Sequence, residues 1–360
     1  DGKEILFRSE RNGWGHYYLY DTATGNLKNQ LTDGTWVAGP VAQIDTVGRK
    51  MYFYGYGGEK GIDPYYYILY EAHLDRPNAL RLLTPENASH EVSISPSCRY
   101  LVDSYSTVSQ EPVNEVRNRN GKVIMTLEKP DLQPVYEMGW KAPERFKVKA
   151  ADGVTDLYGV LWKPADFDST KVYPIISNVY PGPFFEYVPT RFTINDVYNT
   201  RLAQLGFIVI TVGHRGGTPM RGKAYHTYGY NNMRDYPLAD DKYAIEQLAA
   251  RYPFIDATKV GIYGHSGGGF MSGAAICTYP DFYSAAVSSA GNHDNRIYNK
   301  GFVEIHYGVD EKVTTTKDSL GVESKTYDYS VRVRPNQELA KNYKHGLLLF
   351  TGAIDQTVNP

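Results

Sequence analysis

The motif Gly264-His265-Ser266-Gly267-Gly268 is the part of the sequence best suited to carry chemistry. It follows the apolar stretch 260–263, which is typical of a strand, and precedes the helix-like stretch 270–276. A serine on a sharp strand-to-helix turn is exposed at the carboxyl end of a sheet, and flanking glycines let strand and helix approach closely. The sequence therefore predicts Ser266 as a nucleophile for acyl transfer, with the backbone N–H of Gly267 as one oxyanion donor.

A serine nucleophile needs a base, and a carboxylate to orient that base. Asp355 follows the strand-like stretch 347–351, so we expect it to be the acid. In this arrangement the histidine comes after the acid, but all nine histidines precede Asp355: residues 16, 73, 90, 214, 226, 265, 293, 306 and 345. His265 is predicted to point away from the nucleophile, and His345 begins the preceding strand. We therefore expect the catalytic histidine to lie beyond residue 360 and the chain by itself to be inactive.

A second oxyanion donor is predicted at Tyr180. This tyrosine ends the apolar stretch 175–180 and precedes the rigid turn Pro181-Gly182-Pro183. Its position at the carboxyl edge of the sheet would let the phenolic hydroxyl donate to an oxyanion.

These residues must be positioned by an α/β domain. From residue 146 onward, near-continuous apolar strands alternate with helical stretches such as 238–251, which predicts a doubly wound, mostly parallel sheet. The expected strands are 146–149, 157–162, 175–180, 207–212, 260–263, 285–288 and 347–351. The α/β-hydrolase domain is predicted over 141–360.

Residues 1–140 predict a different architecture. Short strands are separated by turn residues, and the segments that begin at Lys3, Lys50 and Arg99 are similar to one another. The pairs Leu31-Thr32 and Leu83-Thr84 each precede the next of these segments by a similar offset. A period of this length is typical of β-propeller blades of about four strands. Two to three blades are too few to close a propeller, so we expect the C-terminal blades of a longer one.

Composition excludes several other classes. The 38 Lys and Arg against 40 Asp and Glu leave no basic excess for nucleic acid binding. No apolar stretch approaches the roughly 18 residues of a membrane span, and the first residues do not resemble a signal peptide. Cys98 and Cys277 fall in different predicted domains, which argues against a disulfide framework or a paired-cysteine metal site. Most of the 32 tyrosines are expected to pack in sheets.

Five ordered motifs resemble those of the prolyl oligopeptidase family of serine peptidases, in its dipeptidyl peptidase IV branch. The motifs are Val179-Tyr180-Pro181-Gly182-Pro183, Arg215-Gly216-Gly217-Thr218 with Arg221-Gly222, Gly264–Gly268, Asp294-Asn295-Arg296-Ile297-Tyr298, and Gly352-Ala353-Ile354-Asp355.

The resemblance implies release of N-terminal dipeptides, often after Pro or Ala, without metal or cofactor. It implies the roles already predicted for Ser266, Asp355 and Tyr180, and it assigns Tyr298 to the S1 pocket for the residue before the cut. Peptide substrates, a homodimer and a periplasmic or extracellular location are further implications.

Several positions depart from the family pattern. Asn299 and Phe302, expected to contact substrate, stand where the family often has Asp and Tyr, and Gly267 leaves space beside S1. Because of these departures, the resemblance does not imply a preference for proline before the cut. The glutamate pair that binds the substrate amino group would lie in preceding blades. Two alternatives remain: an acylaminoacyl-peptidase or esterase of the same superfamily, and a catalytically silent scaffold that binds peptides or proteins.

Overall fold

The computed structural model describes residues 2–358, which form two compact units. Among these residues, the first unit contains 2–145, 189–197 and 219–226, and the second contains 146–188, 198–218 and 227–358. The sequence places the boundary at 140/141, whereas the structure divides the chain after Arg145. The two short segments join the first unit through contacts distant in sequence, such as the 3.1 Å hydrogen bond from Phe192 N–H to Ser106 Oγ.

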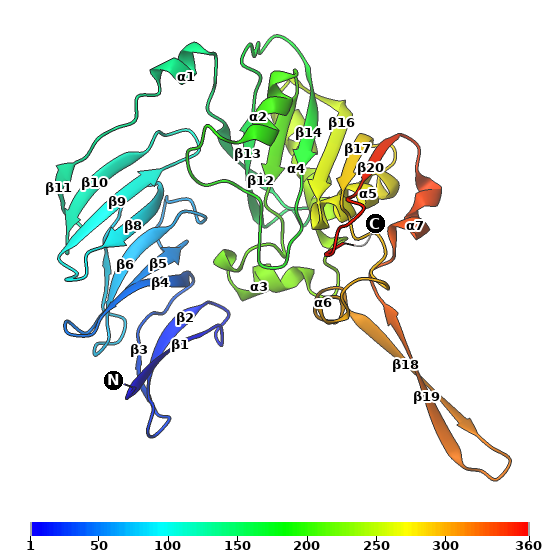
Figure 1. Ribbon diagram of the computed structural model, residues 1–360, viewed down its shortest axis with the longest axis horizontal. Coiled ribbons are helices and arrows are strands. Elements are labelled where there is room, and N and C mark those ends of the chain that lie inside the picture. Colours follow the sequence, from blue (N-terminus) through cyan, green and yellow to red (C-terminus); the bar gives the residue numbers. More distant parts are fainter. Residues whose placement is uncertain (1, 359–360) are drawn as a thin grey trace. The chain divides into compact units, whose positions relative to one another are not determined.

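The first unit contains three antiparallel sheets, drawn from blue to cyan in Figure 1. The strand order is β1-β2-β3, β4-β5-β6-β7 and β11-β10-β9-β8, so each sheet is a meander of sequence neighbours. The strands are β1 (Glu4–Ser9), β2 (His16–Asp21), β3 (Leu27–Gln30), β4 (Val37–Asp45), β5 (Lys50–Tyr56), β6 (Ile68–His73), β7 (Leu80–Leu82), β8 (Ser89–Ile94), β9 (Tyr100–Ser106), β10 (Val113–Asn118) and β11 (Val123–Thr126). The predicted propeller blades are confirmed.

The middle sheet is buried on both faces. Met51 and Phe53 of β5 pack with Tyr17 and Leu19 of the first sheet. Tyr52 points to the opposite face and packs with Leu101 of the third sheet. Because successive side chains of a strand point to opposite faces, one strand joins two layers of the core. The two clusters include seven aromatic residues of the region: Tyr17, Trp36, Phe53, Tyr66 and Tyr70 in one, and Tyr52 and Tyr54 in the other.

The weak sequence repeat has a structural cause in the Leu-Thr pairs. Leu31 N–H donates to the Tyr17 carbonyl at 2.9 Å, and Thr32 Oγ1 accepts from Tyr17 N–H at 3.0 Å. In the next sheet, Leu83 and Thr84 make the same two bonds to Leu69, at 2.9 and 2.8 Å. Both threonines are fully buried. Each pair therefore ties the end of a blade to the preceding strand.

The second unit is built on a seven-stranded sheet with the order β12-β13-β15-β14-β16-β17-β20. β13 and β15 pair antiparallel, while β15, β14, β16, β17 and β20 are parallel. The strands are β12 (Glu144–Lys149), β13 (Asp156–Trp162), β14 (Tyr173–Asn178), β15 (Ile208–Val212), β16 (Ile255–His265), β17 (Tyr283–Ser289) and β20 (Gly346–Phe350). All seven strands lie where the sequence predicts them, which confirms the α/β-hydrolase fold.

Seven α-helices are assigned within residues 2–358. They are α1 (Gln133–Glu137) in the first unit, and, in chain order, α2 (Val197–Gln204), α3 (Lys223–His226), α4 (Tyr236–Arg251), α5 (Gly267–Thr278), α6 (Lys300–His306) and α7 (Asn336–Leu339). Helix α5 packs on β16 and β17 and is buried along almost its whole length. Among the described residues, no helix is long and apolar enough to cross a membrane.

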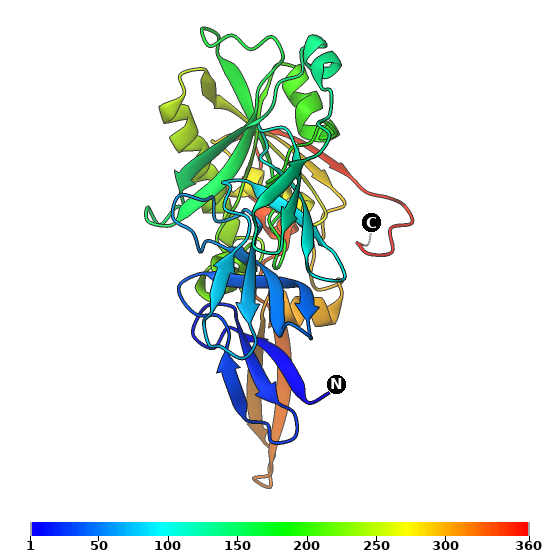
Figure 2. The same cartoon turned by 90° about the vertical axis from the view of Figure 1, so that its left-hand side faces the viewer.

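One element is absent from the predicted set. β18 (Val309–Lys317) and β19 (Glu323–Val331) form a two-stranded antiparallel ribbon between α6 and α7. In both views the ribbon extends away from the rest of its own unit (Figures 1 and 2). Its strands are rich in Val, Thr and Tyr, and the Asp318–Gly321 turn joins them, with Gly321 at φ 81°.

Candidate active site

Ser266 occupies the strained turn that the sequence predicts. It lies between the end of β16 and the first residue of α5, with φ 56° and ψ −119°. Its N–H donates to the Ser289 carbonyl at 2.8 Å, and its own carbonyl accepts from Phe270 N–H at 2.9 Å. A non-glycine residue in such a conformation costs about 1–3 kcal/mol, so the surrounding contacts must hold it.

Close backbone contacts around Ser266 explain the glycines. A Cβ at Gly264 would come within 2.5 Å of the Gly268 backbone, and a Cβ at Gly268 would lie 2.1 Å from the Val179 carbonyl oxygen. Gly267 differs, because a Cβ there would meet only the Pro181 oxygen, at 3.4 Å. Two of the three glycines of the predicted motif are therefore required by space, whereas Gly267 stands in open surroundings.

Tyr180, the predicted second oxyanion donor, lies in the segment that borders this turn. Val179 N–H donates to the Tyr263 carbonyl at 2.9 Å, which places the segment at the carboxyl end of β16. The Tyr180 ring packs edge-on against Phe185, with centroids 5.6 Å apart. Gly182 keeps the turn tight, since a Cβ there would lie 2.5 Å from the Tyr180 ring.

Asp355 follows β20, which is the neighbour of β17 in the sheet. Its Oδ1 accepts backbone N–H bonds from Thr357 and Val358, each at 2.9 Å. These two bonds hold the pKa of the Asp355 carboxyl below its ordinary value, and the nearby His265 ring contributes in the same direction. The predicted acid is therefore an oriented carboxylate in the ionised state.

The three predicted substrate contacts lie together, although they differ in their side-chain roles. Tyr298, Asn299 and Phe302 line one hollow of about 600 Å³ together with Thr357, two residues after Asp355. Phe302 packs edge-on against Tyr298. Asn299 instead caps α6, because its side chain accepts from Phe302 N–H at 3.0 Å. Burial, and then Tyr180 and Asp355, raise the pKa of Tyr298, so this phenol lies near both predicted site residues.

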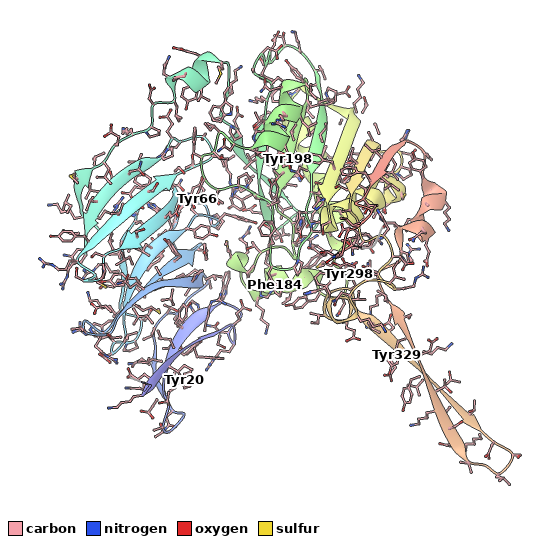
Figure 3. All side chains as sticks on the ribbon, viewed as in Figure 1. Tyr20, Tyr66, Phe184, Tyr198, Tyr298 and Tyr329 are labelled. Atoms are coloured by element: carbon pink, nitrogen blue, oxygen red, sulfur yellow. The ribbon has the colours of Figure 1, made fainter. Side chains whose placement is uncertain are left out.

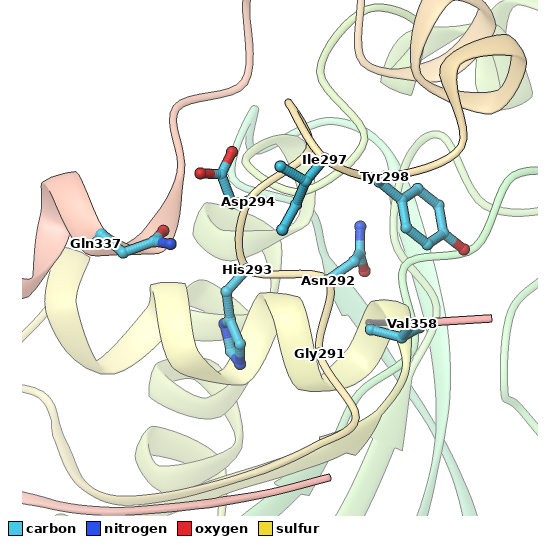
Figure 4. Close-up of a pocket in the computed structure, with 8 residues that line it drawn as sticks. All are labelled: Gly291, Asn292, His293, Asp294, Ile297, Tyr298, Gln337 and Val358. Atoms are coloured by element: carbon cyan, nitrogen blue, oxygen red, sulfur yellow. The ribbon is translucent and has the colours of Figure 1, made fainter. Parts of the chain in front are cut away.

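Beside this hollow lies a pocket of about 230 Å³ that the sequence does not indicate. The loop after β17 forms one wall through Asn292 and His293, and Tyr298 and Val358 contribute to the rest. In Figure 4 the His293 ring lies over helix α5, whereas Asn292 and Tyr298 lie on the side of the loop near Val358. Asn292 donates to Tyr307 Oη at 2.9 Å and to Asn295 Oδ1 at 2.7 Å.

A buried network of polar groups holds the loop after β17 in place. Arg234 donates to Asn336 Oδ1 at 2.5 Å, and Asn336 Nδ2 donates to His293 Nδ1 at 2.8 Å. The other ring nitrogen of His293 lies 3.3 Å from Ser288 Oγ, which donates to the Gly269 carbonyl at 2.7 Å. Because Nδ1 accepts from Asn336, the ring must be neutral, with its proton on Nε2. These residues are far apart in sequence, so no local pattern could have identified them.

His265 is not placed as a base. Its Nδ1 lies 2.9 Å from Ser289 Oγ, so the ring interacts with the neighbouring strand. Within residues 2–358, Ser266 Oγ has no hydrogen bond to a histidine. The predictions that Ser266, Gly267, Tyr180 and Asp355 act together remain predictions, but all four belong to the carboxyl edge of one sheet.

Among the described residues, one cluster has the composition of a metal site. Glu86, His90 and Asp103 of the first unit bring ligand atoms within 4.8 Å of one another. However, the Arg117 guanidinium lies 2.9 Å from oxygens of both Glu86 and Asp103. These carboxylates already have a buried cation, so the cluster fits an ion-pair network better than a metal site.

Comparison with known proteins gives consistent matches along the chain. Residues 195–360 match the family model described as the prolyl oligopeptidase family, and residues 1–112 match the dipeptidyl peptidase IV N-terminal region. Dipeptidyl peptidase 8 of Homo sapiens is 28% identical over 347 residues, which is 85% of this chain and 37% of that protein. A probable dipeptidyl-aminopeptidase B of Aspergillus oryzae is 29% identical and covers 72% of this chain and 29% of its own length.

Solved structures agree with the fold. A putative dipeptidyl aminopeptidase IV from Bacteroides ovatus has a TM-score of 0.81 at 25% identity, covering 100% of this chain and 51% of its own. Dipeptidyl peptidase 4 of Porphyromonas gingivalis has a TM-score of 0.79 at 22% identity and covers 99% and 47%. The chain therefore spans about half the length of these structures and less of the two curated relatives.

The contrast between two adjacent glycines gives a first prediction. In the full-length protein, Gly268→Ala should lower labelling of Ser266 by a fluorophosphonate at least about 100-fold, because the new Cβ would push the turn away from Val179. Gly267→Ala should label within a few-fold of wild type, since its Cβ has space and its N–H is retained. Equal labelling of the two variants would contradict this description of the turn.

A second prediction concerns acid stability. Burial, with the charge of Arg234 adding to it, lowers the pKa of His293. The unfolded chain therefore takes up a proton near the ordinary pKa of about 6.5 that the folded chain does not, and stability from this group is lost as the pH falls below that value. The urea midpoint of His293→Gln should fall less between pH 7.5 and 5.5 than that of wild type. Exposed His345→Gln is the control, and a wild-type-like fall in His293→Gln would refute the assignment.

Proposed function

The chain belongs to the prolyl oligopeptidase family, in its dipeptidyl peptidase IV branch, and from this premise we propose that it is part of a serine exopeptidase that releases N-terminal dipeptides from oligopeptides. One observation carries the proposal. Ser266, at φ 56° between β16 and α5, has the strained geometry that exposes a nucleophile at the carboxyl edge of a sheet. Tyr180 and Asp355 follow β14 and β20 of the same sheet.

The proposed reaction begins with attack of Ser266 Oγ on the carbonyl carbon of the scissile peptide bond. A base takes the serine proton and returns it to the leaving amine, which leaves an acyl-enzyme that water then hydrolyses. Asp355, ionised and held by two backbone N–H groups, orients the base and stabilises its positive charge. The Gly267 N–H and the Tyr180 hydroxyl donate to the oxyanion.

We assign the base to a histidine that follows residue 360. This assignment is supported by the hydrogen bonding of His265 to Ser289 and by the part of its relatives that the chain spans. The 360-residue chain alone is then expected to lack hydrolytic activity. On the family resemblance we also assign the whole protein to the periplasm or the extracellular space.

The residue before the cut would occupy the pocket beside Tyr298. Asn292 contributes a carboxamide to its wall, and His293 contributes a neutral ring. Pro or Ala at this substrate position is the family expectation, and the polar wall is compatible with a wider choice of small side chains.

The decisive experiment uses dipeptidyl p-nitroanilides and the full-length protein. Peptides with a free amino terminus should be cleaved at least about 100-fold faster than N-acetylated peptides of equal sequence, and Ser266→Ala should lower kcat about 10⁴-fold or more. Faster cleavage of blocked peptides would favour the acylaminoacyl-peptidase or esterase alternative. Absence of both turnover and fluorophosphonate labelling at Ser266 would favour the silent scaffold.

The role of Tyr180 is tested separately. In Tyr180→Phe, kcat should fall about 10²–10³-fold with little change in KM, because the lost donor acts on charge that develops only in the transition state. Tyr198→Phe, which removes a hydroxyl from an exposed residue of the same unit (labelled in Figure 3), is the matched control. A rise in KM with unchanged kcat would instead indicate a role for Tyr180 in ground-state binding.

A further inference from the structure

The β18–β19 ribbon has no partner among the residues that the structure describes. Its two nine-residue strands pair without interruption from Val309–Val331 at the base to Lys317–Glu323 near the tip. All its residues except the basal pair Val309 and Val331 are exposed. An isolated two-stranded ribbon is only marginally stable in water. Packing against another surface would therefore stabilise this ribbon.

The two faces of the ribbon differ in chemistry. Since alternate residues share a face, one face carries Val313 beside Tyr327, with Tyr329 one step closer to the base. These three side chains are 45%, 53% and 61% exposed, and Figure 3 labels Tyr329 on the ribbon. The opposite face carries polar residues: Asp310, Lys312, Thr314, Thr316, Ser324, Thr326, Asp328 and Ser330. We refer to the first face as the apolar ribbon face.

Charges on the apolar ribbon face are arranged symmetrically about the Val313–Tyr327 pair. One step toward the base stand Glu311 and Tyr329, and one step toward the tip stand Thr315 and Lys325. If a second copy packed on this face in the opposite direction, with Val313–Tyr327 at the centre, Lys325 of each copy would meet Glu311 and the Tyr329 ring of the other. Both contacts are attractive, since Lys pairs with carboxylates and with aromatic faces.

The ends of the ribbon are also complementary. At its base lies a pocket of about 410 Å³. Its apolar lining is Val303, Val309, Tyr329 and Val331, and its polar lining is Asn295, Arg296, Lys300, Glu304 and Ser330. Asn295 is 2% exposed, and its Nδ2 group has no hydrogen-bond partner. At the tip, Leu320 and Val322 are 87% and 62% exposed.

In an antiparallel pair of ribbons, each ribbon is long enough for its tip to reach the base of the other. Nine strand residues extend about 30 Å, so the tip of one ribbon would reach the basal pocket of the other. Leu320 would pack on Val303, Val309 and Val331, and a carbonyl of the tip would accept from Asn295 Nδ2. A parallel pair would leave both tips exposed and would bring the α/β domains of the two copies to the same end.

We propose that two copies of this chain associate through the β18–β19 ribbon, apolar face to apolar face and antiparallel, with the tip of each ribbon in the basal pocket of the other. Such an interface is isologous, because each surface is complementary to its own copy. The family resemblance implies a homodimer, and this arrangement assigns a surface to it independently of the proposed catalytic reaction.

A charge exchange tests both the surface and the direction of pairing. The oligomeric state of the full-length protein is measured by sedimentation velocity at several concentrations. Glu311→Lys places two lysines together across the interface, and Lys325→Glu places two glutamates together, so each should weaken the dimer at least about 10-fold. The double variant restores opposite charges and should recover dimerisation. Glu311 and Lys325 are not paired within one ribbon, so rescue would report a contact between copies.

Two controls separate the interface from ribbon folding. Tyr327→Asp, on the apolar ribbon face, should abolish the dimer, while Thr326→Asp, on the polar face one residue away, should leave it intact. Circular dichroism and peptidase activity should remain unchanged in all five variants, since none touches the predicted site. A monomeric wild type, dimeric single charge variants, or a double variant that stays monomeric would each overturn the proposal.

Discussion

The backbone at Ser266 can hold its strained conformation only because three chain segments meet there without side chains between them. The Ser289 carbonyl of β17 accepts from Ser266 N–H, and the Val179 carbonyl fills the space where a Cβ of Gly268 would stand. The start of α5 is thereby wedged between the ends of two strands. The segment with Tyr180 and the loop with Asn292 are continuations of those neighbours, so their positions follow from the same close packing.

The two units obtain their stability in different ways. In the second unit, helix α5 is buried along almost its whole length, and it packs on strands β16 and β17 of the parallel sheet. In the first unit each blade shares its faces with its neighbours, and the buried Leu-Thr pairs close the end of one meander before the next begins. Cooperativity in the first unit therefore spreads from blade to blade, as expected of repeat architectures.

Much of the fold could be predicted from local pattern. β15 appears as a continuous apolar stretch because both of its faces are buried, and the blades appear as short strands with a period. β20 is equally apolar in sequence, although Leu348, Leu349 and Phe350 are exposed in the structure. Ser266 and Asp355 could be predicted as candidates because each follows a strand that the sequence marks clearly. Propeller and hydrolase domains are confirmed, whereas the roles of these residues stay predictions.

What the sequence could not indicate depends on contacts between distant residues. Arg234, His293 and Asn336 are each unremarkable in their own segments, and they become a network only when the start of α7 meets the two loops that carry the others. Asn299, expected to contact substrate, has its side chain occupied by the helix it caps. The segments 189–197 and 219–226 lie within the predicted hydrolase range but pack with the blades. The β18–β19 ribbon was missed because charged residues interrupt its Val, Thr and Tyr.

The base of that ribbon is closed by one backbone hydrogen bond, from Arg332 N–H to the Gly308 carbonyl at 3.0 Å. The chain thus leaves the α/β domain and returns to it at nearly the same point, with Gly308 at φ 74° making the departure. An excursion whose ends meet can lengthen, shorten or disappear during evolution while the helices on either side keep their places. A longer or shorter ribbon would therefore change the closure entropy of this excursion only slightly and would leave the geometry around Ser266 intact.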